Sequence, residues 1–158
     1  IIKETEILET GGAIKNIKDK DKTKPIIVIN GDSIIIPDNS KNFLSDLIKN
    51  FDPFKMDFLL LLDDRKKSIG YKGKGDFITN SETFPAKIFR KQAKSFAFTG
   101  WQILNPKIID EIRINKFSLN VCYDKAIENN LLWGIKNSGK WLHIGTKSAL
   151  DEANEWFK

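Results

Sequence analysis

The sequence has one cysteine, Cys122, one histidine, and no apolar run long enough to cross a membrane. A single cysteine excludes an intrachain disulfide and a cysteine-based zinc cluster. A membrane helix needs about 20 consecutive apolar residues, and no signal peptide is recognisable. We therefore expect a cytoplasmic protein that does not associate with membranes. The residues also offer no convincing Ser/His/Asp or Cys/His set for nucleophilic catalysis.

The composition is that of a globular domain. The chain has 158 residues, of which 41% are hydrophobic and 30% are charged. One domain with one sizeable core is the natural expectation at this length. The net charge of +5 comes mainly from scattered lysines and not from a clustered basic stripe. A basic RNA-binding domain is therefore a distant hypothesis, and small anionic ligands are favoured over nucleic acid.

The chain opens on Ile1-Ile2-Lys3, without an initiating methionine. We expect from this that the sequence is a fragment whose upstream part is missing. The alternative is a processed N-terminus.

Residues 24–36 contain an apolar run that stops at Asn30-Gly31-Asp32. Because the run has no polar alternation, it predicts a parallel strand that is buried on both faces. In open α/β sheets, ligands bind outside the carboxyl ends of the strands, and a carboxylate there can hold a hard cation. The alternative is that Gly31 and Asp32 are only turn residues.

Helical and extended patterns alternate along the rest of the chain, which favours an α/β domain with a mainly parallel sheet. In the last predicted helix, 146–157, Thr146 is a candidate N-cap, and Leu150, Ala153, Trp156 and Phe157 are expected to form a buried stripe. Helices are predicted at 9–18, 40–51, 119–130 and 146–157, and extended segments at 56–64, 84–91, 94–106, 131–137 and 139–146.

Three glycine-containing segments are candidates for close approach of a ligand. Gly11 and Gly12 would let a base or ribose approach the backbone, or they form a helix-start turn. Gly100 lies within a predicted strand, which indicates a bulge or a nearby ligand. The pair Gly75-Asp76 could bind sugar hydroxyls or form an exposed turn. Lys87 and Arg90 are candidates to reach an anionic sugar substituent or a phosphate, but solvated surface charge is the favoured interpretation of both.

With these motifs in place, the chain resembles the sugar-phosphate nucleotidyltransferase family from about Ile7 to its end. The resemblance is carried by five segments in the family's order: LETGGAIKN (8–16), VINGDSI (28–34), GKGDF (73–77), FTGWQILNP (98–106) and WLHIGT (141–146). It implies a three-layer, Rossmann-like nucleotidyltransferase domain with a mainly parallel mixed sheet, incomplete at the N-terminus. Residues 1–158 would be the C-terminal portion of that single domain.

The resemblance also implies an activity. Such enzymes join a nucleoside triphosphate to a sugar 1-phosphate, release pyrophosphate and use Mg²⁺. The implied catalytic and metal-binding residues are Asp32 and His143, although the family motif carries an aspartate where this chain has His143. The implied substrate-binding residues are Glu9, Thr10, Gly11, Gly12, Asn30, Gly31, Gly75, Asp76, Thr99 and Gly100.

Two departures from the family keep a second hypothesis open. The Gly-rich loop that holds the triphosphate would lie upstream of this sequence, and magnesium prefers oxygen ligands to the nitrogen of His143. The alternative is a non-catalytic nucleotide- or sugar-binding module of the same fold. The fragment itself is expected to show little or no turnover.

Overall fold

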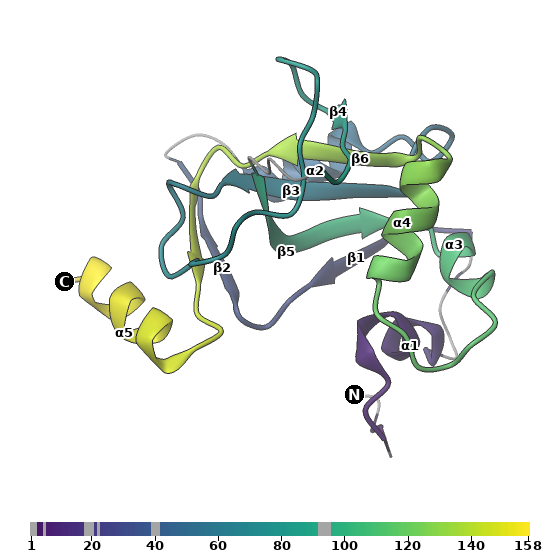
Figure 1. Cartoon of the computed structure of the whole chain (residues 1–158), viewed down its shortest axis with the longest axis horizontal. Helices are drawn as coiled ribbons and strands as arrows, with labels where there is room; N and C mark the ends of the chain where they lie inside the picture. The colour runs from purple at the N-terminus through teal and green to yellow at the C-terminus, as the bar shows by residue number, and fades with distance from the viewer. Residues whose placement is uncertain (1–2, 5, 18–20, 22, 39–41, 92–95) are drawn as a thin grey trace.

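The structure, a computed structural model, describes residues 3–4, 6–17, 21, 23–38, 42–91 and 96–158. Its strands form a five-stranded sheet in the order β1-β5-β3-β6-β4 and a separate pair, β2-β7 (Figure 1). The strands are β1 (Ile26–Ile29), β2 (Ser33–Ile36), β3 (Phe58–Asp64), β4 (Ala86–Lys87), β5 (Phe96–Leu104), β6 (Leu132–Lys136) and β7 (Lys140–His143).

Strand β3 is the centre of the core. Its apolar residues are all buried, because successive side chains enter opposite faces of the sheet and both faces are covered. Phe58, Leu60 and Leu62 pack in one hydrophobic cluster, and Leu59 and Leu61 pack in the other. The extended segment predicted at 56–64 is therefore confirmed as a strand, and both of its faces are covered.

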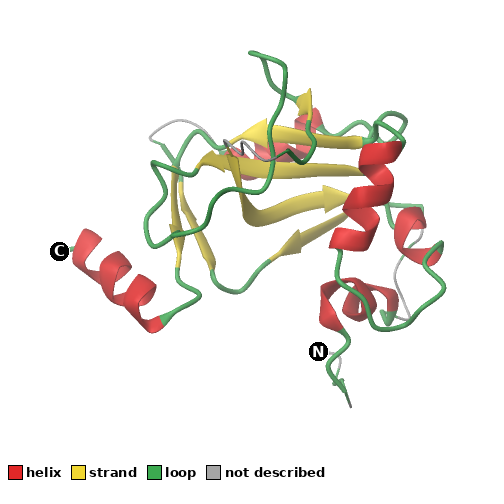
Figure 2. Cartoon of the chain, viewed as in Figure 1, coloured by secondary structure: helices red, strands yellow, loops and turns green. Residues whose placement is uncertain are grey.

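Helices cover the two faces of the sheet. The cluster around Phe58 includes Ile14, Ile109 and Cys122 from three different helices, whereas the cluster around Leu59 includes Leu47 from a fourth. The expected three-layer α/β arrangement is therefore confirmed. The helices, red in Figure 2, are α1 (Glu9–Lys15), α2 (Phe43–Asn50), α3 (Lys107–Asp110), α4 (Asn120–Glu128) and α5 (Lys147–Trp156).

The five-stranded sheet is mixed, as expected, but of its described strand pairs only β3–β6 is parallel, where a mainly parallel sheet was expected. Strands β3 and β6 are parallel, with Leu60 opposite Gly134. Strand β5 runs antiparallel to both β1 and β3, and β4 runs antiparallel to β6. The register between β3 and β5 shifts between Leu60 and Leu62, so β5 carries a bulge around Thr99–Trp101.

Strand β1 differs from the expectation of a parallel strand buried on both faces. It lies at the end of the strand order and pairs antiparallel with β5. Ile26 and Val28 pack against the core, but Ile27 and Ile29 are 40% and 47% exposed. Four consecutive apolar residues indicate a strand, but they specify neither the direction of its neighbour nor its place in the sheet.

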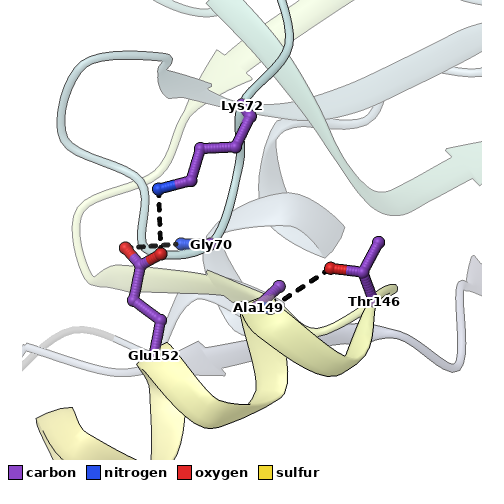
Figure 3. A network of polar contacts seen from close by, with 5 residues as sticks. All are labelled: Gly70, Lys72, Thr146, Ala149 and Glu152. Carbon is purple, nitrogen blue, oxygen red and sulfur yellow. Dashed lines mark hydrogen bonds and ion pairs between the residues drawn. The ribbon is translucent and has the colours of Figure 1, made fainter.

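Helix α5 also differs from the expected packing. Its N-cap is Thr146, as predicted, and the Thr146 hydroxyl oxygen accepts a hydrogen bond from the backbone N–H of Ala149 at 3.2 Å (Figure 3). The buried residues are Ala149 and Ala153, whereas Leu150, Trp156 and Phe157 are exposed. The expected stripe is therefore wrong except at Ala153, because α5 packs through its small residues.

Polar contacts tie α5 to the loop that follows β3. The Glu152 carboxylate accepts a hydrogen bond from the backbone N–H of Gly70 at 3.3 Å and forms an ion pair with Lys72 at 2.9 Å (Figure 3). These contacts lower the pKa of the Glu152 carboxyl, with the bond from Lys72 as the main cause. Within the described residues, no helix is both long and apolar enough to span a membrane.

Candidate functional site

The turn Asn30–Asp32 carries the chain from the five-stranded sheet to the two-stranded one. The backbone N–H of Asn30 donates to the carbonyl of Gly100 at 2.9 Å. Gly100 has a φ of +86°, and a Cβ on it would lie only 2.8 Å from Cβ of Asn30. The predicted close approach at Gly100 is therefore that of the protein's own turn, which glycine permits because it has no side chain.

Asp32 and His143 lie side by side although 111 positions separate them in the chain. Ser33 of β2 pairs with His143 of β7, and the carbonyl of Asp32 accepts the backbone N–H of Ile144 at 2.8 Å. The Asp32 carboxylate is 3.8 Å from Nδ1 of His143, and the two side chains are 46% and 31% exposed. The two residues that the resemblance implies as metal-binding therefore lie close together, as a shared site requires.

Gly145 is a member of this site that sequence reasoning quoted but did not single out. A Cβ on Gly145 would lie 2.7 Å from Oδ2 of Asp32 and 2.9 Å from Cε1 of His143. Any larger residue would displace both side chains. Gly31, by contrast, has open space where a Cβ would lie. The surroundings of Gly31 therefore do not require a glycine at this position.

A cavity of about 330 Å³ lies near the Asp32–His143 pair; we call it the Asp76 cavity. Tyr71 links His143 to this cavity, because its ring contacts that of His143 at 6.1 Å between centroids and also lines the cavity. The walls are Thr10, Asn30, Tyr71, Asp76, Phe77, Arg90, Phe98, Gln102, Ser118, Leu119, Asn120 and Tyr123.

The carboxylate of Asp76 is fixed within this cavity. It accepts the backbone N–H of Phe98 at 2.9 Å and lies 3.5 Å from the hydroxyl of Tyr71, which in turn accepts the backbone N–H of Gly75 at 3.1 Å. Gly75 has a φ of +85°, a conformation that favours glycine. The pair Gly75-Asp76 is therefore not an exposed turn: it presents a held carboxylate to the cavity.

Two tyrosines supply neutral hydroxyls to the Asp76 cavity. Burial is the main cause that raises the pKa of Tyr71, and burial likewise raises the pKa of Tyr123 far above its usual range. Tyr123 donates a hydrogen bond to the buried side chain of Gln102 at 2.9 Å. Sequence reasoning missed all three residues, since they come from separate segments of the chain.

A second, more open cavity of about 520 Å³ is lined in part by the Asn30–Asp32 turn. We call it the Asp32 cavity. Thr10 and Asn30 line both cavities. Glu9 has a φ of +59°, which is uncommon for a residue with a side chain and typical of strained functional positions. The walls are Glu4, Ile7, Glu9, Thr10, Ala13, Val28, Ile29, Asn30, Gly31 and Asp32.

Gly11 and Gly12 line neither of these two cavities. A Cβ on Gly11 would lie 2.4 Å from the ring of Phe117, and one on Gly12 would lie 2.2 Å from the carbonyl oxygen of Asn115. The backbone N–H of Gly12 also donates to the carbonyl of Phe117 at 3.2 Å. These glycines let α1 pack closely on the segment 115–117, which is a structural reason for their presence.

Thr99 is buried and already has its hydrogen bonds. Its side chain is 1% exposed, and its hydroxyl donates to the carbonyl of Leu61 at 2.9 Å. Its own carbonyl accepts from the hydroxyl of Ser33. These contacts give Thr99 a structural role, and its expected role in substrate binding stays a prediction.

Few candidate metal ligands lie near Asp32 and His143 in the described part of the chain. Asp32 and His143 are adjacent, but the described residues contain no group of three or more His, Cys, Asp or Glu side chains that could hold a metal ion. A site of this kind suits a cation that takes most of its ligands from water or from a bound phosphate.

Comparison with known proteins places this geometry in a wider context. No family model matches the sequence. Over 144 residues the chain is 26% identical to N-acetylmuramate alpha-1-phosphate uridylyltransferase from Caulobacter vibrioides, covering 91% of this chain and 59% of that protein. The chain therefore spans about three-fifths of the length of this curated relative.

Solved structures give the same picture. HddC from Yersinia pseudotuberculosis, complexed with GMP-PN, superposes with a TM-score of 0.68 at 24% identity, covering 99% of this chain and 66% of that one. A UDP-glucose pyrophosphorylase complexed with UDP-glucose superposes with a TM-score of 0.69 at 14% identity, covering 99% and 64%. In sequence and in fold, the chain is similar to the sugar-phosphate nucleotidyltransferases.

Proposed function

We propose that this chain carries the metal-binding residue and the sugar-binding cavity of a sugar-1-phosphate nucleotidyltransferase. The reaction would join a nucleoside triphosphate to a sugar 1-phosphate and release pyrophosphate. The similarity to a uridylyltransferase and to enzymes that were solved with GMP-PN and UDP-glucose supports this class of activity.

The observation that carries the proposal is that two cavities adjoin at the Asn30–Asp32 turn. The Asp32 cavity and the Asp76 cavity share Thr10 and Asn30, and Asp32 lines the first of them. A reaction that joins two substrates needs two neighbouring pockets and a charged group close to the reacting atoms. We assign the Asp76 cavity to the sugar and the Asp32 cavity to the nucleotide.

The residues at the edge fit a magnesium ion through Asp32. Magnesium keeps several waters and takes one or two carboxylates together with substrate phosphates, and the Asp32 carboxylate is half-exposed at a cavity wall. His143 offers a nitrogen, which magnesium accepts poorly. We therefore assign metal binding to Asp32 and a supporting contact to His143.

When bound, Mg²⁺ would neutralise charge on the α-phosphate of the nucleotide. The sugar phosphate is already ionised at neutral pH, so no general base is needed for its attack. Asp76 would accept hydrogen bonds from the sugar, and the neutral hydroxyl of Tyr71 lies close to it. Thr10 and Asn30 would orient both substrates at the shared wall.

A specific observation favours one alternative function. His143 stands beside Asp32 where the family motif has an aspartate, so a second carboxylate is absent at this point of the chain. The alternative is a binding module of the same fold that holds nucleotide or sugar without chemistry. It predicts binding without pyrophosphate release.

The decisive experiment measures pyrophosphate release by the gene product in its natural length. The assay supplies Mg²⁺, each nucleoside triphosphate in turn and a panel of sugar 1-phosphates. Release that requires both substrates supports the enzyme. Nucleotide or sugar binding by calorimetry without any release supports the module.

A further inference from the structure

Arg90 is the one cationic side chain among the described residues that line the Asp76 cavity. The sequence leaves open whether it is a solvated surface charge. In the structure its guanidinium lies over the ring of Phe77, 5.4 Å from the centroid, and 38% of its side chain is exposed. A stacked and partly covered guanidinium is poorly hydrated and therefore suited to binding an anion.

Helix α4 holds this guanidinium in one orientation. One Nη donates to the side-chain oxygen of Asn120 at 2.7 Å, and Nε lies 3.1 Å from the carboxylate of Asp124. A guanidinium has five N–H donors in a planar fork. The contacts with these two α4 residues leave donors for a ligand, and they remove part of the entropy cost of ordering the side chain.

The place of Arg90 decides which end of a sugar phosphate it can meet. Arg90 lines the Asp76 cavity but not the Asp32 cavity. A sugar 1-phosphate must direct its phosphate toward Asp32 to react there. An acidic group that meets Arg90 therefore belongs to the opposite part of the sugar.

We propose that Arg90 selects a sugar 1-phosphate that carries a carboxylate substituent on the sugar. Asp76 and Arg90 then divide the recognition: Asp76 accepts from hydroxyl or amide groups, and Arg90 donates to the carboxylate in a charge-assisted bond. This inference rests on the proposed function, because it assumes that the cavity holds the sugar.

The test is calorimetric titration of the chain with three probes. These are N-acetylmuramate α-1-phosphate, its carboxyl methyl ester, and N-acetylglucosamine α-1-phosphate, which lacks the acidic substituent. The acid should bind about tenfold to a hundredfold more tightly than the ester, the range for a hydrogen-bonded charge pair. Arg90→Gln should bind acid and ester alike, at the affinity that the unsubstituted chain has for the ester.

Lys87→Gln is the matched control, because Lys87 lies over Trp133, outside both cavities. It should keep the preference for the acid. A thermal melt checks that Arg90→Gln is folded; if it is not, Arg90→Lys keeps the charge but loses the planar fork, and its preference for the acid should fall several-fold.

Four results would overturn the proposal. Equal affinity of the unsubstituted chain for acid and ester would show that the carboxylate is not recognised. An equal loss for all three probes in Arg90→Gln would show that Arg90 binds the phosphate instead. An unchanged preference for the acid in folded Arg90→Gln or Arg90→Lys would assign selection to another residue. Absence of binding of any sugar phosphate by the unsubstituted chain would count against the proposed function itself, and the inference would fall with it.

Discussion

The carbonyl of Asp32, just before β2, accepts the backbone N–H of Ile144, just after β7, so a hydrogen bond extends the pairing of the two strands to the place where the site lies. This contact fixes the backbone on both sides of the Asp32–His143 pair. The side chains are therefore held close together by strand register and not by their own weak attraction, which at 3.8 Å between half-exposed groups is small.

Gly145→Ala should disturb this pair without unfolding the protein. The added methyl group would lie 2.7 Å from the Asp32 carboxylate and 2.9 Å from the His143 ring, and both side chains can move toward solvent. We expect affinity for Mn²⁺, a spectroscopic substitute for Mg²⁺, to fall about tenfold to a hundredfold, as for other changes around metal ligands. Electron paramagnetic resonance measures it.

Gly31→Ala is the stability control for that variant, since nothing lies within 4 Å of its added Cβ. Both variants should melt within a few degrees of the unsubstituted chain. A Gly145→Ala protein with unchanged Mn²⁺ affinity would separate Gly145 from the metal site.

Gly12→Ala should destabilise the fold. Its Cβ would lie 2.2 Å from the carbonyl oxygen of Asn115, and the contact is with backbone, which cannot rotate away. We expect a loss of about 1–3 kcal/mol in the free energy of unfolding, measured by urea titration. If stability were unchanged and nucleotide binding were lost, the ligand role expected from the sequence would be correct and the packing role would not.

Thr99→Val separates a structural role from a substrate role. The hydroxyl of Thr99 is buried and donates to the carbonyl of Leu61, so its removal leaves a buried acceptor with one partner fewer. The free energy of unfolding should fall by about 1–3 kcal/mol. Affinity for sugar 1-phosphates should not change; a folded, equally stable variant that no longer binds them would contradict this account.

Asp63→Asn tests the pH dependence of stability. Asp63 is buried, accepts a hydrogen bond from the amide of Asn137 at 3.0 Å, and has its pKa raised above 3.8 mainly by burial. The folded protein binds the proton of the Asp63 carboxyl more tightly than the unfolded chain does. Protonation of Asp63 therefore stabilises the fold, and this contribution is fully present below about pH 4. It is lost as the pH rises through the folded pKa.

An asparagine at position 63 can accept the same bond from Asn137 without a charge. At pH 7 the variant should therefore be more stable than the unsubstituted chain, and the difference should shrink as the pH falls toward 3.5. Urea titrations across that range measure it. A difference that is constant with pH, or that favours the unsubstituted chain at pH 7, would argue against a buried charge at Asp63.

Local patterns and motif order predicted much of the fold. The apolar segment 56–64 correctly indicated a strand, and Asp32 and His143, which the resemblance assigns to one metal site, lie close together. Both conclusions depend on short segments whose residue types are compatible with few other structures or roles. The N-cap Thr146 was predictable for the same reason.

Contacts between distant segments were not predictable in this way. The packing of Gly12 depends on Asn115, and the outward position of Ile29 depends on the place of β1 in the sheet. The exposed face of α5, with Phe157, follows from packing through alanines, which a pattern of large apolar residues does not reveal. Thr99 faces inward because of a bulge, whose register is set by β3.

Asp32→Asn tests the central claim most directly. The substitution keeps the size of the side chain and removes its charge from the wall of the Asp32 cavity, two residues from Asn30, which lines both cavities. In the gene product of natural length, pyrophosphate release at limiting Mg²⁺ should fall at least about a hundredfold, since a lost metal contact costs several kcal/mol in the transition state. The melting temperature should stay the same. Near-normal release by Asp32→Asn at limiting Mg²⁺ would contradict the account, because Asp32 would then be a turn residue only.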